Sequence, residues 1–214
     1  MFLEQGYSAT SPKHIVNALQ TGTGNLTYYF PTKEHLLAVL VDMLCDFQWR
    51  MMEREADDGI SSIMAICLEL AAMAAICETD PVAKDFYTSS YASPMCLEII
   101  RKNDTARAKC VFADFCPNWT DEQFAEAEVL VSGIEYATLM TAGDPVSLET
   151  KIAGALNAIL QIYQIPADIR KMKIQRVLQM DYRTIAQRTL IAFKHFVDRT
   201  NEQALEQLHR QADA

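Results

Sequence analysis

Glycine, proline and paired cysteines are scarce in this chain of 214 residues. Only seven glycines and seven prolines interrupt it, and Ala, Leu, Ile, Met, Glu and Gln are abundant, which indicates an all-α protein. The six cysteines form no Cys-x-x-Cys motif, and none of them has a histidine nearby in sequence. We interpret them as reduced and mostly buried, rather than as metal ligands or disulfides.

No signal peptide is visible in the sequence, so none is expected, and no long apolar run is free of charge. The most apolar stretch, residues 60–77, contains Glu69, so it predicts a buried core helix and no membrane contact. There is no glycine-rich phosphate loop and no nucleophile elbow, and the four histidines are far apart. We therefore predict a cytoplasmic protein that is not an enzyme and has no catalytic residue, metal or cofactor.

Residues 10–30 predict two short helices joined by a tight turn. Thr10 or Ser11 can cap the first helix, and Pro12 suits its first turn, where a missing N–H costs nothing. After a break at residues 20–21, Gly22 or Thr23 can cap a second helix that runs to about residue 29. This is the arrangement that lays one helix in a DNA major groove. The apolar side of the first helix is predicted to consist of Ile15, Val16 and Leu19.

A set of motifs accompanies these two helices. The motifs are Phe2, Gly6-Tyr7, Thr10-Ser11, Ile15-Val16, Gly24-Asn25-Leu26, Tyr28-Tyr29-Phe30, Lys33 and Leu36-Leu37. With them, residues 1–40 resemble the TetR-type (tetracycline-repressor-like) bacterial transcriptional regulators. The resemblance implies a helix-turn-helix DNA-binding domain over residues 1–40 and a helical effector-binding and dimerisation domain over residues 41–214. It also implies a homodimer, a double-stranded DNA operator and a small-molecule effector.

Three features differ from that family's usual pattern, and one of them is Thr27, which stands where the family usually has tyrosine after the recognition-helix leucine. The family usually has glycine in the turn, where this chain has Gln20. Of the family's long first helix, only residues 1–5 are represented, about its last turn. We expect either that the true start lies upstream or that the DNA-binding domain is incomplete.

The expected DNA contacts lie on and around the second short helix. Asn and Thr side chains at the start of such a helix can reach base edges, while Tyr hydroxyls and Lys favour phosphates. The alternative is that the tyrosines only pack and the hydroxyls only cap; the family resemblance favours DNA contact. The predicted set is Lys13, Thr21, Thr23, Asn25, Thr27, Tyr28, Tyr29 and Lys33.

The charge distribution bears on this prediction. The formal net charge is −9. Residues 55–165 hold most of the acidic excess, with 17 acidic against six basic residues. Residues 1–54 are close to neutral, with four basic and five acidic side chains, so nonspecific attraction to DNA should be weak. Affinity should come from helix N-termini, hydroxyls and the doubled contacts of a dimer.

The rest of the chain predicts a series of helices. A connecting helix is expected over residues 32–55, with the domain boundary inside it. Thr120 and Gln123 form a capping box, with Trp119 and Phe124 in the staple positions around it. The helices at about 121–142 and 148–164 carry apolar stripes and are predicted to form a four-helix bundle in the dimer. Further helices are expected at about 60–77, 81–91, 94–115, 167–180 and 182–209.

A mostly apolar pocket with a few polar anchors is expected in the second domain. Methionine, cysteine, tyrosine and phenylalanine side chains gather on helices that otherwise need only Leu and Ala, although each of them can equally be ordinary core. The predicted lining is Met64, Cys67, Leu68, Tyr87, Tyr91, Met95, Phe112 and Tyr136. The sequence thus predicts a transcriptional regulator, a repressor released by its effector. The alternative is a helical ligand-binding or protein-interaction dimer that has lost DNA binding.

Overall fold

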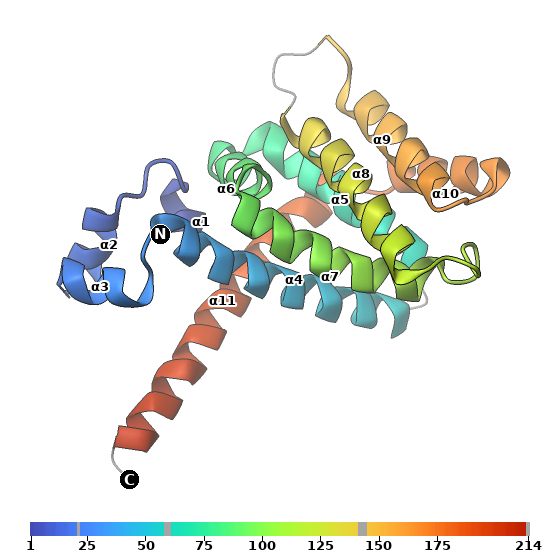
Figure 1. Ribbon diagram of the computed structural model, residues 1–214. Helices are drawn as coiled ribbons and strands as arrows, with labels where there is room; N and C mark the ends of the chain where they lie inside the picture. The colour runs from blue at the N-terminus through green and yellow to red at the C-terminus, as the bar shows by residue number, and fades with distance from the viewer. Residues whose placement is uncertain (21, 58–60, 141–144, 213–214) are drawn as a thin grey trace.

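The computed structural model describes residues 1–20, 22–57, 61–140 and 145–212, with only the backbone of residues 52–57 and 204–212. Within these residues the chain is all-α, as predicted, with no strand. Figure 1 shows a small unit of three short helices at one end of α4 and a larger bundle beyond it. The helices are α1 (Phe2–Gln5), α2 (Pro12–Ala18), α3 (Thr23–Tyr29), α4 (Lys33–Asp57), α5 (Ser62–Thr79), α6 (Pro81–Ala92), α7 (Pro94–Phe112), α8 (Asp121–Met140), α9 (Leu148–Ile162), α10 (Ala167–Gln179) and α11 (Tyr182–Ala212).

The predicted pair of short helices is confirmed as α2 and α3. Ser11 caps α2: its hydroxyl accepts a hydrogen bond from the His14 N–H at 3.2 Å, and Pro12 occupies the first turn. Gly22 is the N-cap of α3. The predicted apolar side of α2 is only partly correct. Ile15 and Val16 are buried, but α2 ends at Ala18, and Leu19 is left exposed at its C-cap.

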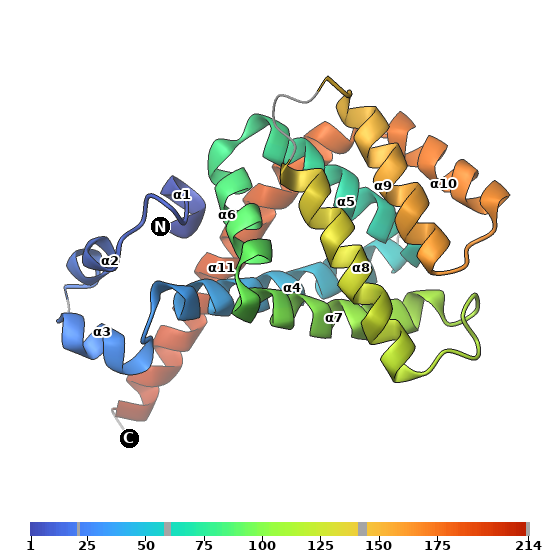
Figure 2. The same cartoon turned by 45° about the horizontal axis from the view of Figure 1, so that its top comes forward.

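Helix α4 joins the small unit to the bundle (Figure 2). It begins beside α3 and packs against α5, α7 and α11 further along. Its buried side chains recur at helical spacing and include Leu37, Val41, Leu44 and Phe47. One helix therefore carries residues of both the small unit and the core of the bundle.

Helix α5 is the centre of the bundle and packs against α4 and α6–α11. Of the described helices, only α5 is long and apolar enough to cross a membrane, but most of it is buried inside the bundle. Its alanines, such as Ala71 and Ala75, let the neighbouring helices approach closely. These contacts fit the predicted core helix. Its N-terminus lies two residues later than predicted, because Ser61 caps it through a hydrogen bond from the Met64 N–H at 3.4 Å.

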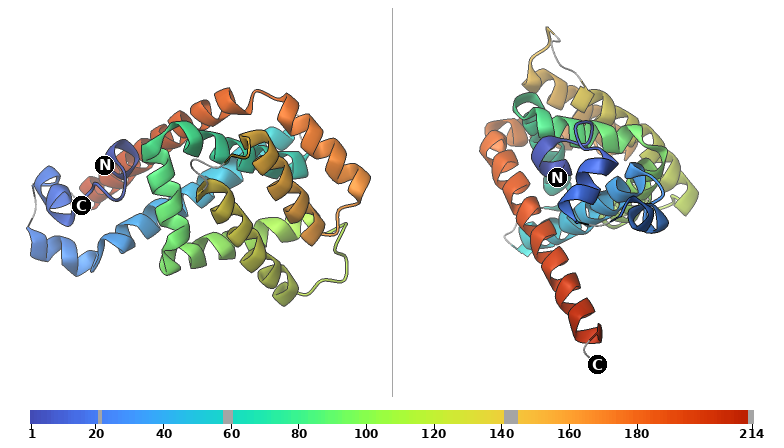
Figure 3. Two further views of the ribbon diagram at one scale, coloured as in Figure 1. Left: turned by 90° about the horizontal axis from the view of Figure 1, so that it is seen from above. Right: turned by 90° about the vertical axis from the view of Figure 1, so that its left-hand side faces the viewer.

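The remaining helix boundaries agree closely with the predictions. The capping box at α8 forms: the Thr120 N–H donates to Gln123 at 2.8 Å, and the Gln123 N–H donates to Thr120 at 3.3 Å. The Trp119 and Phe124 rings lie 5.1 Å apart beside it. Helix α7 ends at Phe112, earlier than expected. The predicted end of α8 at residue 142 lies outside the described residues. Helix α11 packs along α5 and α4 and then extends past the bundle (Figure 3).

Candidate functional site

Helix α3 presents a polar and aromatic surface. Leu26 is its only buried residue. Tyr28 and Tyr29 are 79% and 68% exposed, and their rings meet edge to face at 5.0 Å. Exposed tyrosines at this density are unusual for a helix that serves only as packing, because burial of their rings would stabilise the fold. The other members of the predicted DNA-contact set on α3, which are Thr23, Asn25 and Thr27, are also exposed.

The outer members of the predicted set differ from one another. Lys13 is exposed on α2. The Lys33 ammonium donates to the Tyr7 carbonyl oxygen at 2.8 Å and lies 3.9 Å from the centre of the Tyr7 ring. Lys33 therefore holds the start of α4 against the loop before α2, and a phosphate would have to compete with this contact. Thr21 lies outside the described residues.

The turn between α2 and α3 contains a non-glycine residue with positive φ. Gln20 has φ 50°, in the left-handed region that costs an L-residue about 1–2 kcal/mol. The turn therefore needs the conformation that glycine adopts without that cost. This explains why glycine is usual at this position of the family pattern, and it shows that the helix-turn-helix geometry forms here with glutamine.

The small unit is fastened to α6 of the bundle. Asp85 accepts hydrogen bonds from the Ser8 N–H at 2.7 Å and from the Ser8 hydroxyl at 2.5 Å. Gly6 has φ 92°, and a Cβ atom there would lie 2.7 Å from an Asp85 carboxylate oxygen. Nearby, the Ser93 hydroxyl donates to Glu34 of α4. Two hydrogen-bonded contacts thus tie the small unit and α4 to α6 and its C-terminal end.

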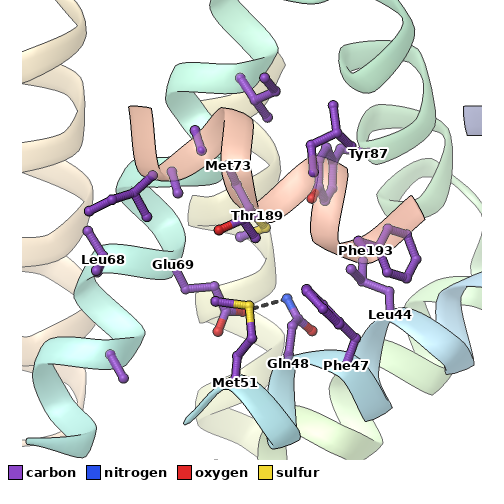
Figure 4. Close-up of a pocket in the computed structure, with 16 residues that line it drawn as sticks. Leu44, Phe47, Gln48, Met51, Leu68, Glu69, Met73, Tyr87, Thr189 and Phe193 are labelled. Atoms are coloured by element: carbon purple, nitrogen blue, oxygen red, sulfur yellow. Dashed lines mark hydrogen bonds between the residues drawn. The ribbon is translucent and has the colours of Figure 1, made fainter. Parts of the chain in front are cut away.

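The bundle encloses two adjoining cavities. Each has a cavity volume of ≈ 50 Å³, which is room for about four water molecules. The first is apolar and lies between α4, α5, α6 and α11, as Figure 4 shows. The second lies between α4, α5, α6, α7 and α8 and reaches Tyr163 after α9. The two share a wall formed by Leu44, Gln48, Glu69, Met73 and Tyr87.

The predicted pocket residues divide between these cavities and the surrounding core. Leu68 lines the first cavity, Tyr91 and Phe112 line the second, and Tyr87 lines both. The other four predicted residues line neither cavity, because they pack against or within the core: Met64 and Cys67 are buried, and Met95 and Tyr136 are partly buried.

Charged residues that the sequence analysis did not select line the second cavity. They are Glu69, Asp104, Arg107, Glu128 and Glu135. The sequence does contain one indication of these charged residues. Glu128 and Glu135 are seven residues apart, which is two turns along α8, and they lie beside the buried Val131. An acidic pair on a buried helix stripe points to an internal site, because such carboxylates are almost never fully buried without partners.

Hydrogen bonds connect these charged groups. Arg107 forms a two-pronged ion pair with Glu69, and its Nη1 also reaches Asp104 at 3.1 Å. The Tyr91 hydroxyl donates to Glu135 at 2.8 Å, and the Tyr163 hydroxyl donates to Glu128. Tyr163 is itself held by stacking on Phe112 at 4.0 Å between ring centres. Tyr91 and Tyr163 therefore position the two α8 carboxylates, Glu135 and Glu128.

Burial controls the protonation of the cavity carboxylates. Burial, reinforced by the nearby Asp104, raises the pKa of Glu128 to about 8 and raises the pKa of Glu135 well above its usual range. Burial also raises the pKa of Asp104 to about 6, although Arg107 opposes this shift. The Arg107 pKa is raised, because Glu69 and Asp104 outweigh the effect of burial. The cavity without a ligand thus favours neutral carboxyl groups on α8.

Comparison with known proteins identifies the N-terminal unit. Residues 1–40 match the family model described as "Bacterial regulatory proteins, tetR family". Searches of curated proteins and of solved structures gave no match. The matched range contains α1–α3 and the start of α4, which are the elements that hold the exposed face of α3. The N-terminal region of this chain is therefore a DNA-binding domain of the tetR family of bacterial regulatory proteins.

Proposed function

We propose that the chain is a homodimeric, cytoplasmic repressor that binds a double-stranded DNA operator through α3 and releases it when a small effector occupies the cavities of the bundle. One observation carries the proposal. Helix α6 contacts both parts of the molecule, because Asp85 binds the DNA-binding unit while Tyr87 and Tyr91 line the cavities.

Helix α3 carries the side chains that we propose for the DNA contact. Its exposed hydroxyls, and an amide at Asn25, stand in the first turns of the helix, where side chains reach base edges. Tyr28 and Tyr29 follow, where their hydroxyls meet the phosphate backbone. The N-terminus of α3 adds main-chain N–H groups and a partial positive charge. These features would add affinity to a unit whose only lysines are Lys13 and Lys33 and which has no arginine.

Helices α8 and α9, which pack side by side, form the proposed dimer contact. On α8, Val129 is 49% exposed, Leu130 57% and Met140 46%. Gly133 lies among them, and a Cβ atom there would meet nothing within 4 Å. A second copy of α8 and α9 would cover this face in a four-helix bundle and fix the spacing between the two α3 helices.

Release of the operator then requires only a shift in populations. The effector binds more tightly to a dimer whose α3 helices are wrongly spaced for successive major grooves. A coupling of about 1–3 kcal/mol between the sites is enough to change occupancy usefully. Because the cavities hold only about four waters each, an effector larger than this must displace side chains, and α4 and α6 supply some of them.

The test is selection of DNA fragments from a random duplex library, followed by measurement of affinity for the selected and a scrambled duplex at moderate salt. We expect a clear preference for the selected sequence. The double substitution Thr23→Ala, Asn25→Ala should remove this preference, because it deletes the groups placed to reach base edges. The matched control is Gln175→Ala, Gln187→Ala, which removes two exposed polar side chains on α10 and α11.

The control variant should bind as the unmodified protein does. If selection yields no preferred sequence, or if the α3 double variant keeps the full preference, the repressor proposal fails. A dimeric protein that binds a ligand but shows no sequence preference would support the alternative, a ligand-binding dimer without DNA recognition.

A further inference from the structure

The second cavity holds more carboxylates than cations. Four acidic side chains line it, and Arg107 is the only basic residue among its lining. Arg107 pairs with Glu69 and Asp104. Glu128 and Glu135 receive hydrogen bonds from tyrosines but take part in no ion pair within the described residues. Ionised, these two would leave a negative charge without an ion-pair partner, and Arg107 and Arg101 only partly offset the charge on Glu128.

A second feature of the cavity is independent of the acidic cluster. Arg107 is 5% exposed, and its Nε is the only buried side-chain nitrogen or oxygen without a hydrogen-bond partner among the described residues. An arginine N–H can only donate. Leaving such a donor unpaired is costly, so the cavity is short of one hydrogen-bond acceptor beside its excess of carboxylates.

The apolar cavity begins where the polar one ends. Gln48 of α4 donates a hydrogen bond to Glu69 of α5 at 2.6 Å, and both side chains line both cavities. Figure 4 draws this bond as the dashed line next to Met51, with Phe47 beside Gln48. A ligand that separates Gln48 from Glu69 would extend from the polar cavity into the apolar one.

We propose that the effector of this chain is an amphiphilic organic cation, with its nitrogen between Glu128 and Glu135, an acceptor oxygen close to that nitrogen, and its apolar part in the first cavity. This inference rests on the proposed ligand-controlled function. The acceptor oxygen meets the unpaired Arg107 Nε. An anion is disfavoured by the four carboxylates. A metal ion is disfavoured because no group of three His, Cys, Asp or Glu in the described part of the chain is placed to hold one.

Binding of such a cation is linked to protons. Without ligand, Glu128 and Glu135 favour the neutral form because they are buried near other acidic groups. A neighbouring cation favours ionisation, so binding should release protons at neutral pH. The charged and titratable groups that face the pair are Glu69 on α5, Tyr91 on α6, Arg101, Asp104 and Arg107 on α7, and Tyr163 after α9.

The test is calorimetric titration of the full chain, without DNA, with four probes that share a hexyl chain: hexyltrimethylammonium, its N-hydroxyethyl analogue hexyl(2-hydroxyethyl)dimethylammonium, 1-hexanol and hexanoate. Both cations should bind at least about tenfold more tightly than the alcohol and the acid, and the hydroxyethyl cation most tightly, since charge-assisted contacts in a dry site are the strong ones. Repeating the titration in phosphate and in Tris buffer counts the protons released.

The double variant Glu128→Gln, Glu135→Gln should bind the cations at least about tenfold more weakly and release no proton, while its affinity for 1-hexanol stays the same. Its control is Glu126→Gln, an exposed position on the same helix, which should change neither quantity. Both variants keep side-chain shape, and their helicity and melting temperature are measured first.

Tighter binding of hexanoate or 1-hexanol than of the cations overturns the inference, as does undiminished cation binding by the double variant, or no binding by any probe at millimolar concentration. Sequence-specific DNA binding is measured on the same preparation. Retained DNA binding with failed cation binding rejects only the ligand class, whereas lost sequence preference with cation binding intact rejects the repressor and leaves the ligand site standing.

Discussion

Gly6→Ala should selectively destabilise the DNA-binding unit. With φ 92° and ψ 157°, Gly6 occupies a region of backbone space that is almost exclusive to glycine, and a residue with a side chain there costs about 1–3 kcal/mol. The new Cβ would also lie 2.7 Å from the Asp85 carboxylate, which must therefore move away from Ser8. Each of the two lost hydrogen bonds contributes about 1 kcal/mol. We expect a total loss of at least about 3 kcal/mol.

Hydrogen exchange measured by mass spectrometry can detect this loss locally. A loss of about 3 kcal/mol corresponds to roughly 100-fold faster exchange of the amides in α1–α3 if they exchange through opening of that unit. The amides of α5 should change little, because the hydrophobic core around α5 is not altered. DNA affinity should fall, because binding would first have to restore the docked unit, while ligand binding in the bundle should persist.

Two further variants test the physical reasoning. Gly24→Ala, in the first turn of α3, places a Cβ atom in open space and should stabilise the helix by at most about 0.5–1 kcal/mol. In an Asp85→Ala background, Gly6→Ala should cost only its backbone part, which leaves a coupling of about 1–2 kcal/mol between the two sites. Equal costs of Gly6→Ala in both backgrounds would refute the clash, and unchanged exchange in α1–α3 would refute the whole account.

Three other predictions follow from single residues. Gln20→Gly should raise the free energy of unfolding of the DNA-binding unit by about 0.5–1 kcal/mol, measured in urea, because the turn holds φ 50°; a lower value would contradict this. Leu130→Glu should convert the proposed dimer to a monomer in light scattering at micromolar concentration, whereas Glu126→Gln should not. The buried Glu128 has a pKa raised from 4.5 to about 8, so folding takes up a proton between these values. Stability should therefore fall as pH rises through this window, by at most about 1.4 kcal/mol per pH unit, and Glu128→Gln should remove that slope.

Local signals predicted most of the fold. The caps at Ser11 and Thr120, and Pro12 directly after Ser11, mark helix starts that depend on a few neighbouring residues, so the sequence alone was sufficient to place them. The prediction that Leu19 belongs to the apolar side of α2 was wrong, because the burial of this residue depends on where α2 ends and on which surface faces it. Neither property is contained in the 3.6-residue period.

The cavity was harder to predict for a physical reason. Methionine and cysteine fill irregular gaps in any core, so Met64 and Cys67 were poor indicators of empty space. The polar side of the cavity depends on residues from four helices, and contacts such as that between Arg107 and Glu69 join positions 38 apart in sequence. Only the spacing of Glu128 and Glu135 along α8 could have been recognised beforehand.

The position of α6 gives the two parts of the molecule a common element. Tyr91 on α6 donates to Glu135, and one turn and a half earlier Asp85 accepts from Ser8 of the DNA-binding unit. A ligand that draws Glu135 away from Tyr91, or that displaces Tyr87 at the shared wall, changes the free energy of the same helix that holds the unit in place. Because Glu34 of α4 also accepts from Ser93 at the end of α6, α4 is bound to this element as well. A cavity of small volume is suited to such control, because its ligand must displace the surrounding side chains to enter. A conformation in which these side chains are already displaced therefore binds the ligand more tightly, and this difference in affinity can shift the population between two conformations of the chain.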